Sequence, residues 1–199
     1  MKILWEDRLL YAVLALLVLA VFYGIYFAKV LVQKHRGIQT RQIGRRKEKS
    51  IHMVEVLMSI ATLGAPIAQF LSIALDWIYL PAGVRLTGFC VGMLGDAIFL
   101  LSVLCMKDSW RAGIPDKDKT ELVTTGIYRF SRNPAFLGFD LMYVGVLLLY
   151  GNLLTLSFSA FAIVMLHLQI LQEERYLVNN FGAPYQEYCR HVFRYLGRK

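Results

Sequence analysis

Two polar stretches of this 199-residue chain carry side chains whose types and spacing could do chemistry together. The first, Thr120–Gly138, precedes an apolar hairpin, and the second, Gln172–Arg175, follows directly after it. The two arms of a helical hairpin are antiparallel, so we expect both stretches to meet at one membrane face. The side chains gathered there would be Tyr128, Arg129, Arg132 and Asn133 from the first stretch and Glu173 and Glu174 from the second. Their meeting point is the candidate active site.

Glu173 and Glu174 are acids that follow an apolar run directly and face a basic segment. A carboxylate in this position could hold the ammonium group of a cationic ligand. The alternative is a solvated helix end, where these acids pair with Arg175 or Arg129 and contribute little.

Three further acids, Glu55, Asp96 and Asp140, lie inside apolar segments. A charge placed in the bilayer costs roughly 2.5 kcal/mol or more, so such residues are candidates for function. The alternative is an acid that is protonated or hydrogen-bonded between helices.

Asn133 and Pro134 have the residue types of a helix start, with Asn133 as the N-cap and Pro134 as the first helical residue. The free N–H groups of such a helix start bind carboxylates and other anions. Trp110 and Arg111, in the segment Trp110–Ile114, are typical of membrane-edge anchors. Alternatively, they stack on the ring of a ligand.

The elements that must position these residues are apolar helices. The chain is 57% hydrophobic and 18% charged, against about 45–50% and about 25% in soluble domains. We therefore predict an all-α integral membrane bundle of about five transmembrane helices, forming a single membrane domain over residues 1–199. Residues 1–106 would hold three spans, and residues 107–199 the hairpin and the site. The predicted helices are about Leu9–Val32, Met53–Leu75, Leu86–Met106, Ala135–Leu149 and Leu153–Leu171, with a turn at Tyr150–Asn152.

Two of these helices carry irregular features. Pro66 removes one hydrogen bond near the middle of the second helix and favours a kink there. The fourth helix has only about 15 residues, whereas a span needs about 20. It therefore either starts below the interface at Arg132 or packs against protein rather than lipid.

The basic residues predict the orientation of the chain in the membrane. Lys and Arg number seven in the loop 34–50, six in residues 107–134 and five in residues 172–199, all on one side if five helices alternate. The opposite side has three, so the positive-inside rule places the N-terminus outside and the C-terminus and active site in the cytoplasm. A net charge of +8 then reflects loops facing anionic lipid rather than nucleic acid. In the tail, Tyr185–Leu196 has the spacing of an amphipathic helix at the interface.

The cysteines and histidines are scattered, and we expect no metal site. Cys90, Cys105 and Cys189 are far apart in the sequence and form no C-x-x-C pattern.

Two separated motifs, within about Trp110 to Leu196, resemble those of one known family. They read L-V-T-T-G-I-Y-R-F-S-R-N-P-A-F-L-G and, after the hairpin, E-E-R-Y-L-x-x-x-F-G-x-x-Y-x-x-Y. This arrangement resembles the isoprenylcysteine carboxyl methyltransferase family, in a wider group that includes the phospholipid N-methyltransferases. The resemblance implies that S-adenosylmethionine is the cofactor. The cofactor-binding residues it implies are Leu122, Val123, Tyr128, Asn133, Pro134, Ala135, Phe136 and Glu173.

The sequence departs from the family pattern at three positions. Asn133 stands where the motif has histidine, and Phe136 stands where it has tyrosine. Gln169 stands where members that act on prenylcysteine carry an arginine for the substrate carboxylate, and a neutral amide lacks that charge and its two-pronged geometry. Arg132 or Arg129 would then have to compensate.

These features predict a membrane methyltransferase whose lipophilic substrate enters from the bilayer. A carboxyl group of a prenylcysteine-like acid is the leading acceptor, with Gln169 and Arg129 at the substrate and Arg132 as a catalytic residue. An amine acceptor would need a base, and Asp140 or Glu174 would be nearest. The alternatives are a phospholipid or small-molecule N- or S-methyltransferase, and a non-catalytic transporter or scaffold.

Overall fold

The computed structural model describes residues 2–40, 42, 49–113 and 120–198. Its elements, in chain order, are α1 Lys2–His35, α2 Lys49–Leu75, α3 Ala82–Met106, the 3₁₀ turns η1 Lys107–Ser109 and η2 Gly126–Arg129, α4 Pro134–Leu149, α5 Leu153–Phe181 and α6 Ala183–His191. The described ranges contain helices and turns but no strand, which confirms the all-α prediction. All five predicted apolar helices are present.

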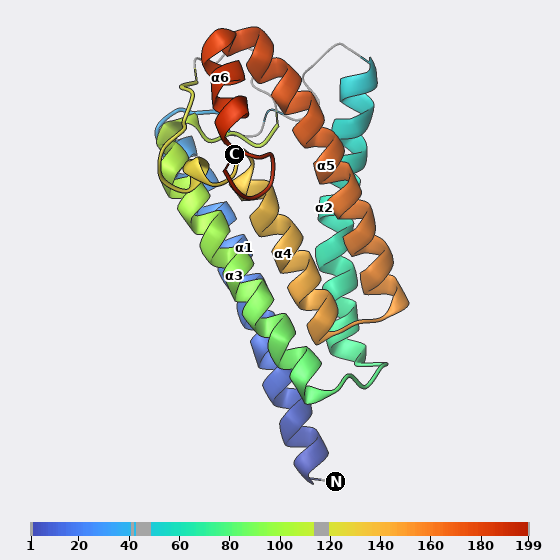
Figure 1. Cartoon of the computed structure of the whole chain (residues 1–199). Coiled ribbons are helices and arrows are strands. Elements are labelled where there is room, and N and C mark those ends of the chain that lie inside the picture. The colour runs from blue at the N-terminus through green and yellow to red at the C-terminus, as the bar shows by residue number, and fades with distance from the viewer. Residues whose placement is uncertain (1, 41, 43–48, 114–119, 199) are drawn as a thin grey trace.

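The long helices form two groups (Figure 1). α4 packs along α3, which also contacts α1, while α2 packs along α5. α5 additionally contacts α4 and so joins the groups. α6 and the C-terminal tail lie at one end of the bundle, and the N-terminus lies at the other (Figure 1).

The contact between α3 and α4 is made by glycines. A Cβ atom added at Gly145 would lie 2.5 Å from the Cα of Gly92, and one added at Gly138 would lie 2.9 Å from the carbonyl oxygen of Gly95. Small residues let two helix backbones approach this closely, which is a common device for helix packing in membranes. The glycines therefore fix α4, and with it the polar segment that precedes α4, against α3.

α4 is short because protein surrounds it. Its 16 residues measure about 24 Å at 1.5 Å per residue, less than the roughly 30 Å of a hydrocarbon core. Every residue of α4 is buried or half-buried. Of the two explanations offered for its length, packing against protein is therefore the one that the structure supports.

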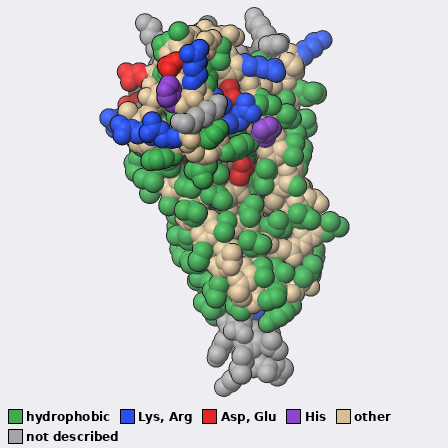
Figure 2. Space-filling model, viewed as in Figure 1, with side chains coloured by type: hydrophobic (Ala, Val, Ile, Leu, Met, Phe, Trp, Pro, Cys, Tyr) green, Lys and Arg blue, Asp and Glu red, His purple; other side chains and the backbone are tan. Residues whose placement is uncertain are grey.

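The outer surface of the bundle is apolar. α1 (from Arg8), α2, α3 (with η1) and α5 are each long and apolar enough to cross a membrane, and their exposed side chains include Leu9, Phe27, Leu63 and Leu104. Figure 2 shows a hydrophobic belt below a charged cap at the end that holds α6. The protein is therefore an integral membrane protein. Part of the predicted basic loop 34–50, at residues 41 and 43–48, lies outside the described residues.

α2 runs unbroken through Pro66 from Lys49 to Leu75. Because proline has no N–H group, the carbonyl of Thr62 lacks its usual helical donor. The Thr62 hydroxyl bonds one turn back, donating to the carbonyl oxygen of Met58 at 2.8 Å.

The tail differs from its prediction. The expected helix Tyr185–Leu196 is helical only to His191, and Val192 is extended. The following residues bond to the segment before α4 instead: the Arg132 amide donates to the Phe193 carbonyl at 3.1 Å, and the Gly197 amide donates to the Phe130 carbonyl at 2.7 Å. These bonds replace the helical ones, so the tail lies over residues 130–132, and the prediction of a helix through Leu196 was wrong.

Candidate active site

A cavity of about 780 Å³ lies at the α6 end of the bundle and extends between the helices. All six helices contribute to its wall, together with residues on both sides of η2. The predicted site residues among those that line it are Leu122, Val123, Tyr128, Arg132, Asn133, Ala135, Phe136, Gln169 and Glu173. The fold thus brings together the two stretches that sequence analysis expected to meet.

Glu173 and Gln169 mark the polar side of this cavity on α5. Gln169 is fully buried, and its Nε2 donates to Oε1 of Glu173 at 3.1 Å. The opposite amide orientation would place two acceptor oxygens together, so Glu173 fixes which way the amide faces. The Gln169 Oε1 has no hydrogen-bond partner within the described ranges and remains an acceptor for whatever the cavity holds.

The segment before α4 is held by Tyr188 of α6. Gly126 begins η2 with φ +61°, where glycine is favoured. The Tyr188 hydroxyl donates to the carbonyl oxygens of Tyr128, at 2.6 Å, and Ser131, at 3.3 Å. Burial raises the pKa of both Tyr128 and Tyr188 above the usual value, so both phenols stay protonated. α6 therefore holds this segment in place at the cavity wall.

Asn133 starts α4 but does not cap it with its side chain. Its Nδ2 instead donates to Oε1 of Glu174 and to the Arg194 carbonyl, both at 3.2 Å. The early N–H groups of a helix have no intrahelical acceptor, and Ala135 and Phe136 of this first turn line the cavity. The helix start thus keeps backbone donors at the cavity wall, although the predicted side-chain cap is absent.

Glu174 is surrounded by positive groups. Arg132 Nη2 lies 3.0 Å from its Oε1, and Arg194 donates from Nε at 3.0 Å and Nη2 at 2.8 Å to its Oε2. The bonds to Glu174 raise the pKa of Arg194 above its usual value. Glu174 lies outside the lining of the main cavity and borders a second hollow of about 430 Å³, which we call the rim groove. This groove lies between Leu171, Arg175 and Val178 of α5 and Cys189 and Arg194 after it.

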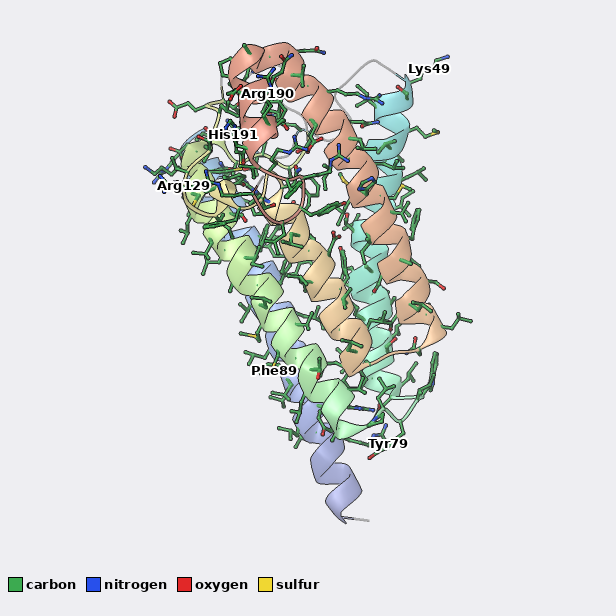
Figure 3. The ribbon with its side chains drawn as sticks, in the orientation of Figure 1. Lys49, Tyr79, Phe89, Arg129, Arg190 and His191 are labelled. Atoms are coloured by element: carbon green, nitrogen blue, oxygen red, sulfur yellow. The ribbon has the colours of Figure 1, made fainter. Side chains whose placement is uncertain are left out.

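Three other predicted residues lie outside the cavity lining. Asp140 is half-buried on α4 and has Tyr195 as an electrostatic neighbour. Arg129 is exposed and projects from the edge of the bundle (Figure 3). Pro134 is buried as the first residue of α4. Among the acids within the helices, Glu55 and Asp96 are both buried and neither lines the cavity.

Several lining residues were not selected by sequence analysis. Tyr176 and Leu177 follow Glu173 by three and four residues on α5, so they lie on the face that carries Gln169 and Glu173. This helical spacing was the signal that could have found them. Many of the others are aromatic and apolar residues of the helices, such as Tyr23 of α1 and Phe70 of α2, which look like any other residue of an apolar helix.

Comparison with known proteins finds the same likeness as the motifs. Residues 88–184 match the family model described as phospholipid methyltransferase. The protein-S-isoprenylcysteine O-methyltransferase of Schizosaccharomyces pombe is 40% identical over 72 residues, which are 36% of this chain and 30% of that protein. A probable protein-S-isoprenylcysteine O-methyltransferase of Oryza sativa subsp. indica is 32% identical over 114 residues, 55% of this chain and 59% of that protein. The Saccharomyces cerevisiae protein-S-isoprenylcysteine O-methyltransferase is 41% identical over 72 residues, 36% of this chain and 30% of that protein.

These matches confirm the resemblance that the motifs indicated. The matched region begins in α3 and ends early in α6, so it contains the hairpin and both polar stretches. The chain spans less than two thirds of the length of these relatives.

Proposed function

We propose that this protein is a membrane-embedded methyltransferase that uses S-adenosylmethionine to methylate a lipophilic substrate. The observation that carries the proposal is the composition of the main cavity. Polar and charged groups gather where the two motifs meet, and apolar side chains, many of them from α1 and α2, line most of the remainder. The polar part of the cavity suits a methyl donor with several charges, and the apolar part suits an acceptor with a long apolar chain.

The polar groups of the cavity fit S-adenosylmethionine. Glu173 offers a carboxylate to the ammonium of the cofactor, and the free amides of Ala135 and Phe136, with Arg132, offer donors to its carboxylate. Leu122 and Val123 supply backbone and apolar contacts, and Tyr128 supplies an aromatic face. When bound, the cofactor supplies a methyl group on a positively charged sulfonium.

The apolar part of the cavity suits a substrate that arrives from the lipid. Leu16 of α1 and Leu63 and Phe70 of α2 line the cavity and are also exposed on the outer surface. α1 and α2 therefore border a lateral route between lipid and cavity. A prenylcysteine-like acid is our leading substrate class, because the curated relatives are isoprenylcysteine O-methyltransferases.

The residues of the chain would act mainly by positioning. A carboxylate acceptor needs no base, so alignment in a cavity that excludes water supplies the rate enhancement. We assign Arg132 to hold an anionic group, and we assign Glu174 to hold Arg132 in place rather than to take a proton. This assignment leaves Asp140 and Arg129 without a role at the cavity.

A phospholipid or small-molecule N- or S-methyltransferase is the second candidate, and one observation favours it. Gln169 replaces the arginine expected for a substrate carboxylate, and its Nε2 bonds to Glu173 with one of its two hydrogens, while its Oε1 has no partner within the described ranges. The amide therefore presents an oxygen to the cavity, which suits an acceptor group that carries a hydrogen, such as an amine.

The proposed orientation places the cavity mouth in the cytoplasm. Eighteen Lys and Arg lie on the side that carries the two motifs, against three on the other, which favours the cytoplasm for the motif side. Cysteine-accessibility labelling of the N-terminus and of residue 129 in intact cells tests this orientation. Only a cysteine at the N-terminus should react with an impermeant reagent.

Methyl transfer is tested with purified protein, a membrane extract and S-adenosylmethionine labelled on its methyl group. Label in the organic phase that base releases as methanol identifies an ester, and label that resists base identifies N- or S-methylation. No transfer and no cofactor binding would overturn the proposal.

The role of Glu173 is tested by Glu173→Gln, which should weaken cofactor binding by at least about ten-fold, because an ammonium loses its charged partner. The control is Glu187→Gln, which removes an exposed acid of α6 and should leave the affinity unchanged. Equal affinities for both variants would contradict the assignment.

A further inference from the structure

The rim groove adjoins the proposed catalytic cavity, with which it shares Arg132 and Tyr185, and it carries excess positive charge. Arg132, Arg175 and Arg194 border it, with Glu174 as the only acid among its described lining residues. Glu174 is bonded to Arg132 and Arg194, so the arrangement keeps two positive charges that it does not neutralise. A groove of about 430 Å³ is large enough for a phosphate-bearing group.

Arg175 is the residue of the groove that is available to a ligand. It is exposed, and its guanidinium has no ion-pair or hydrogen-bond partner anywhere in the described part of the chain. Arg194 lies across the groove, and its Nε and Nη2 bond to Glu174. Its Nη1 has no such bond to a described residue, so two guanidinium groups can donate to one anion.

The surroundings of Arg175 are those of a membrane interface. Leu171 lies one turn nearer the middle of the bundle, Val178 lies one turn further out, and both border the groove with Arg175. The hydrophobic belt of the bundle ends at the charged cap around α6 (Figure 2). A ligand in the groove can therefore place apolar chains against α5 on the bilayer side and an anionic group at Arg175.

We infer that the rim groove binds the anionic headgroup of a membrane phospholipid. Basic pockets at the cytoplasmic side of helix bundles recognise such headgroups, because phosphate and guanidinium are complementary in charge and geometry. The uncompensated charge disfavours the choline of a zwitterionic lipid. The inference depends on the groove and its charge and does not require the proposed methyltransferase activity.

The test compares the full-length protein in lipid nanodiscs of phosphatidylcholine with and without phosphatidylglycerol. Native mass spectrometry measures how many phosphatidylglycerol molecules remain bound. Arg175→Gln should lower the affinity for phosphatidylglycerol about five-fold, the effect of one basic residue near a charged surface. The matched control is Arg129→Gln, which removes an exposed arginine that does not line the groove and should leave binding unchanged.

Three outcomes would overturn the inference. Equal retention of the two lipids by the wild-type protein would show that the groove does not select charge. Equal losses in Arg175→Gln and Arg129→Gln would indicate general surface attraction. Displacement of phosphatidylglycerol by water-soluble glycerol phosphate at equal concentration would show a site for free phosphate rather than for a lipid.

Discussion

At each end of the bundle a carboxylate is held between two arginines, and the two clusters differ in what lies beside them. At the end away from α6, Asp76 bonds to Arg8 and Arg85, both at 3.0 Å, and the Arg85 guanidinium also lies 4.9 Å from the Tyr150 ring centroid. At the α6 end, Glu174 bonds to Arg132 and Arg194.

The first cluster joins secondary-structure elements and borders neither the main cavity nor the rim groove. Arg8 lies in α1, Asp76 follows α2, Arg85 lies in α3 and Tyr150 follows α4, so the cluster ties four chain segments together. The second cluster holds Arg132, which lines both the main cavity and the rim groove. Similar ion pairs can thus serve stability alone at one end and the geometry of a site at the other.

The largest expected effect is that of Glu174→Ala. Removal of this acid leaves Arg132, whose side chain is 12% exposed, without its partner, which should cost about 3 kcal/mol of unfolding free energy. Because Arg132 and Asn133 both lose a bond at the cavity wall, methyl transfer per folded molecule should also fall by at least about ten-fold. Thermal unfolding in detergent and the labelled-methyl assay measure the two effects. Unchanged methyl transfer would show that the Glu174 cluster, like the Asp76 cluster, serves stability alone.

Asp76→Asn should lower the stability almost as much but leave cofactor binding unchanged. Arg85 has a 3% exposed side chain and would keep its bond to the Ile78 carbonyl, its contacts with the Tyr11 and Tyr150 rings and a neutral amide oxygen. It would lose its charged partner, so a loss of about 3 kcal/mol is expected. Cofactor affinity, measured by calorimetry on the folded fraction, should equal that of the wild type. A weakened cofactor affinity would mean that the two ends are coupled.

Arg194→Gln should have a smaller effect at the α6 end. Two charge-assisted bonds disappear, but the side chain is 37% exposed, and Arg132 still pairs with Glu174. We expect about 1 kcal/mol in stability and a loss of a few-fold in cofactor affinity. A loss as large as that of Glu174→Ala would show that the tail, rather than Arg132, holds the acid.

Arg8→Gln should have the smallest effect. The Arg8 side chain is 49% exposed, and exposed ion pairs contribute about 0.2–1 kcal/mol. The double variant Arg8→Gln/Asp76→Asn should therefore differ little in melting temperature from Asp76→Asn alone. A strongly non-additive result would place Arg8 inside the buried network.

The sequence predicted the helices and the meeting of the two motifs because both follow from local patterns. Apolar run length sets the spans, and the hairpin brings Tyr128 and Glu173 to one cavity. The different positions of Glu173 and Glu174 were harder to predict from the sequence. Neighbouring helix residues point about 100° apart, so one carboxylate lines the cavity and the other borders the rim groove.

The same rotation between neighbouring helix residues explains why Asp140 does not line the cavity. Phe136 and Phe139 lie on the cavity face of α4, and Asp140 lies on another face. The path of the tail was least predictable. Its residues have helical spacing, but backbone bonds to Phe130 and Arg132 decide its course, and such bonds depend on tertiary contacts that no local pattern reports.

The proline of α2 has a consequence for what the cavity can recognise. Thr62 and Pro66 both line the wall, and the missing N–H of Pro66 leaves the Thr62 carbonyl without its helical donor. We expect a carbonyl that has lost this donor at membrane depth to accept a hydrogen from a bound guest. The selectivity of the main cavity would then depend on Pro66, a residue that contributes no polar side chain.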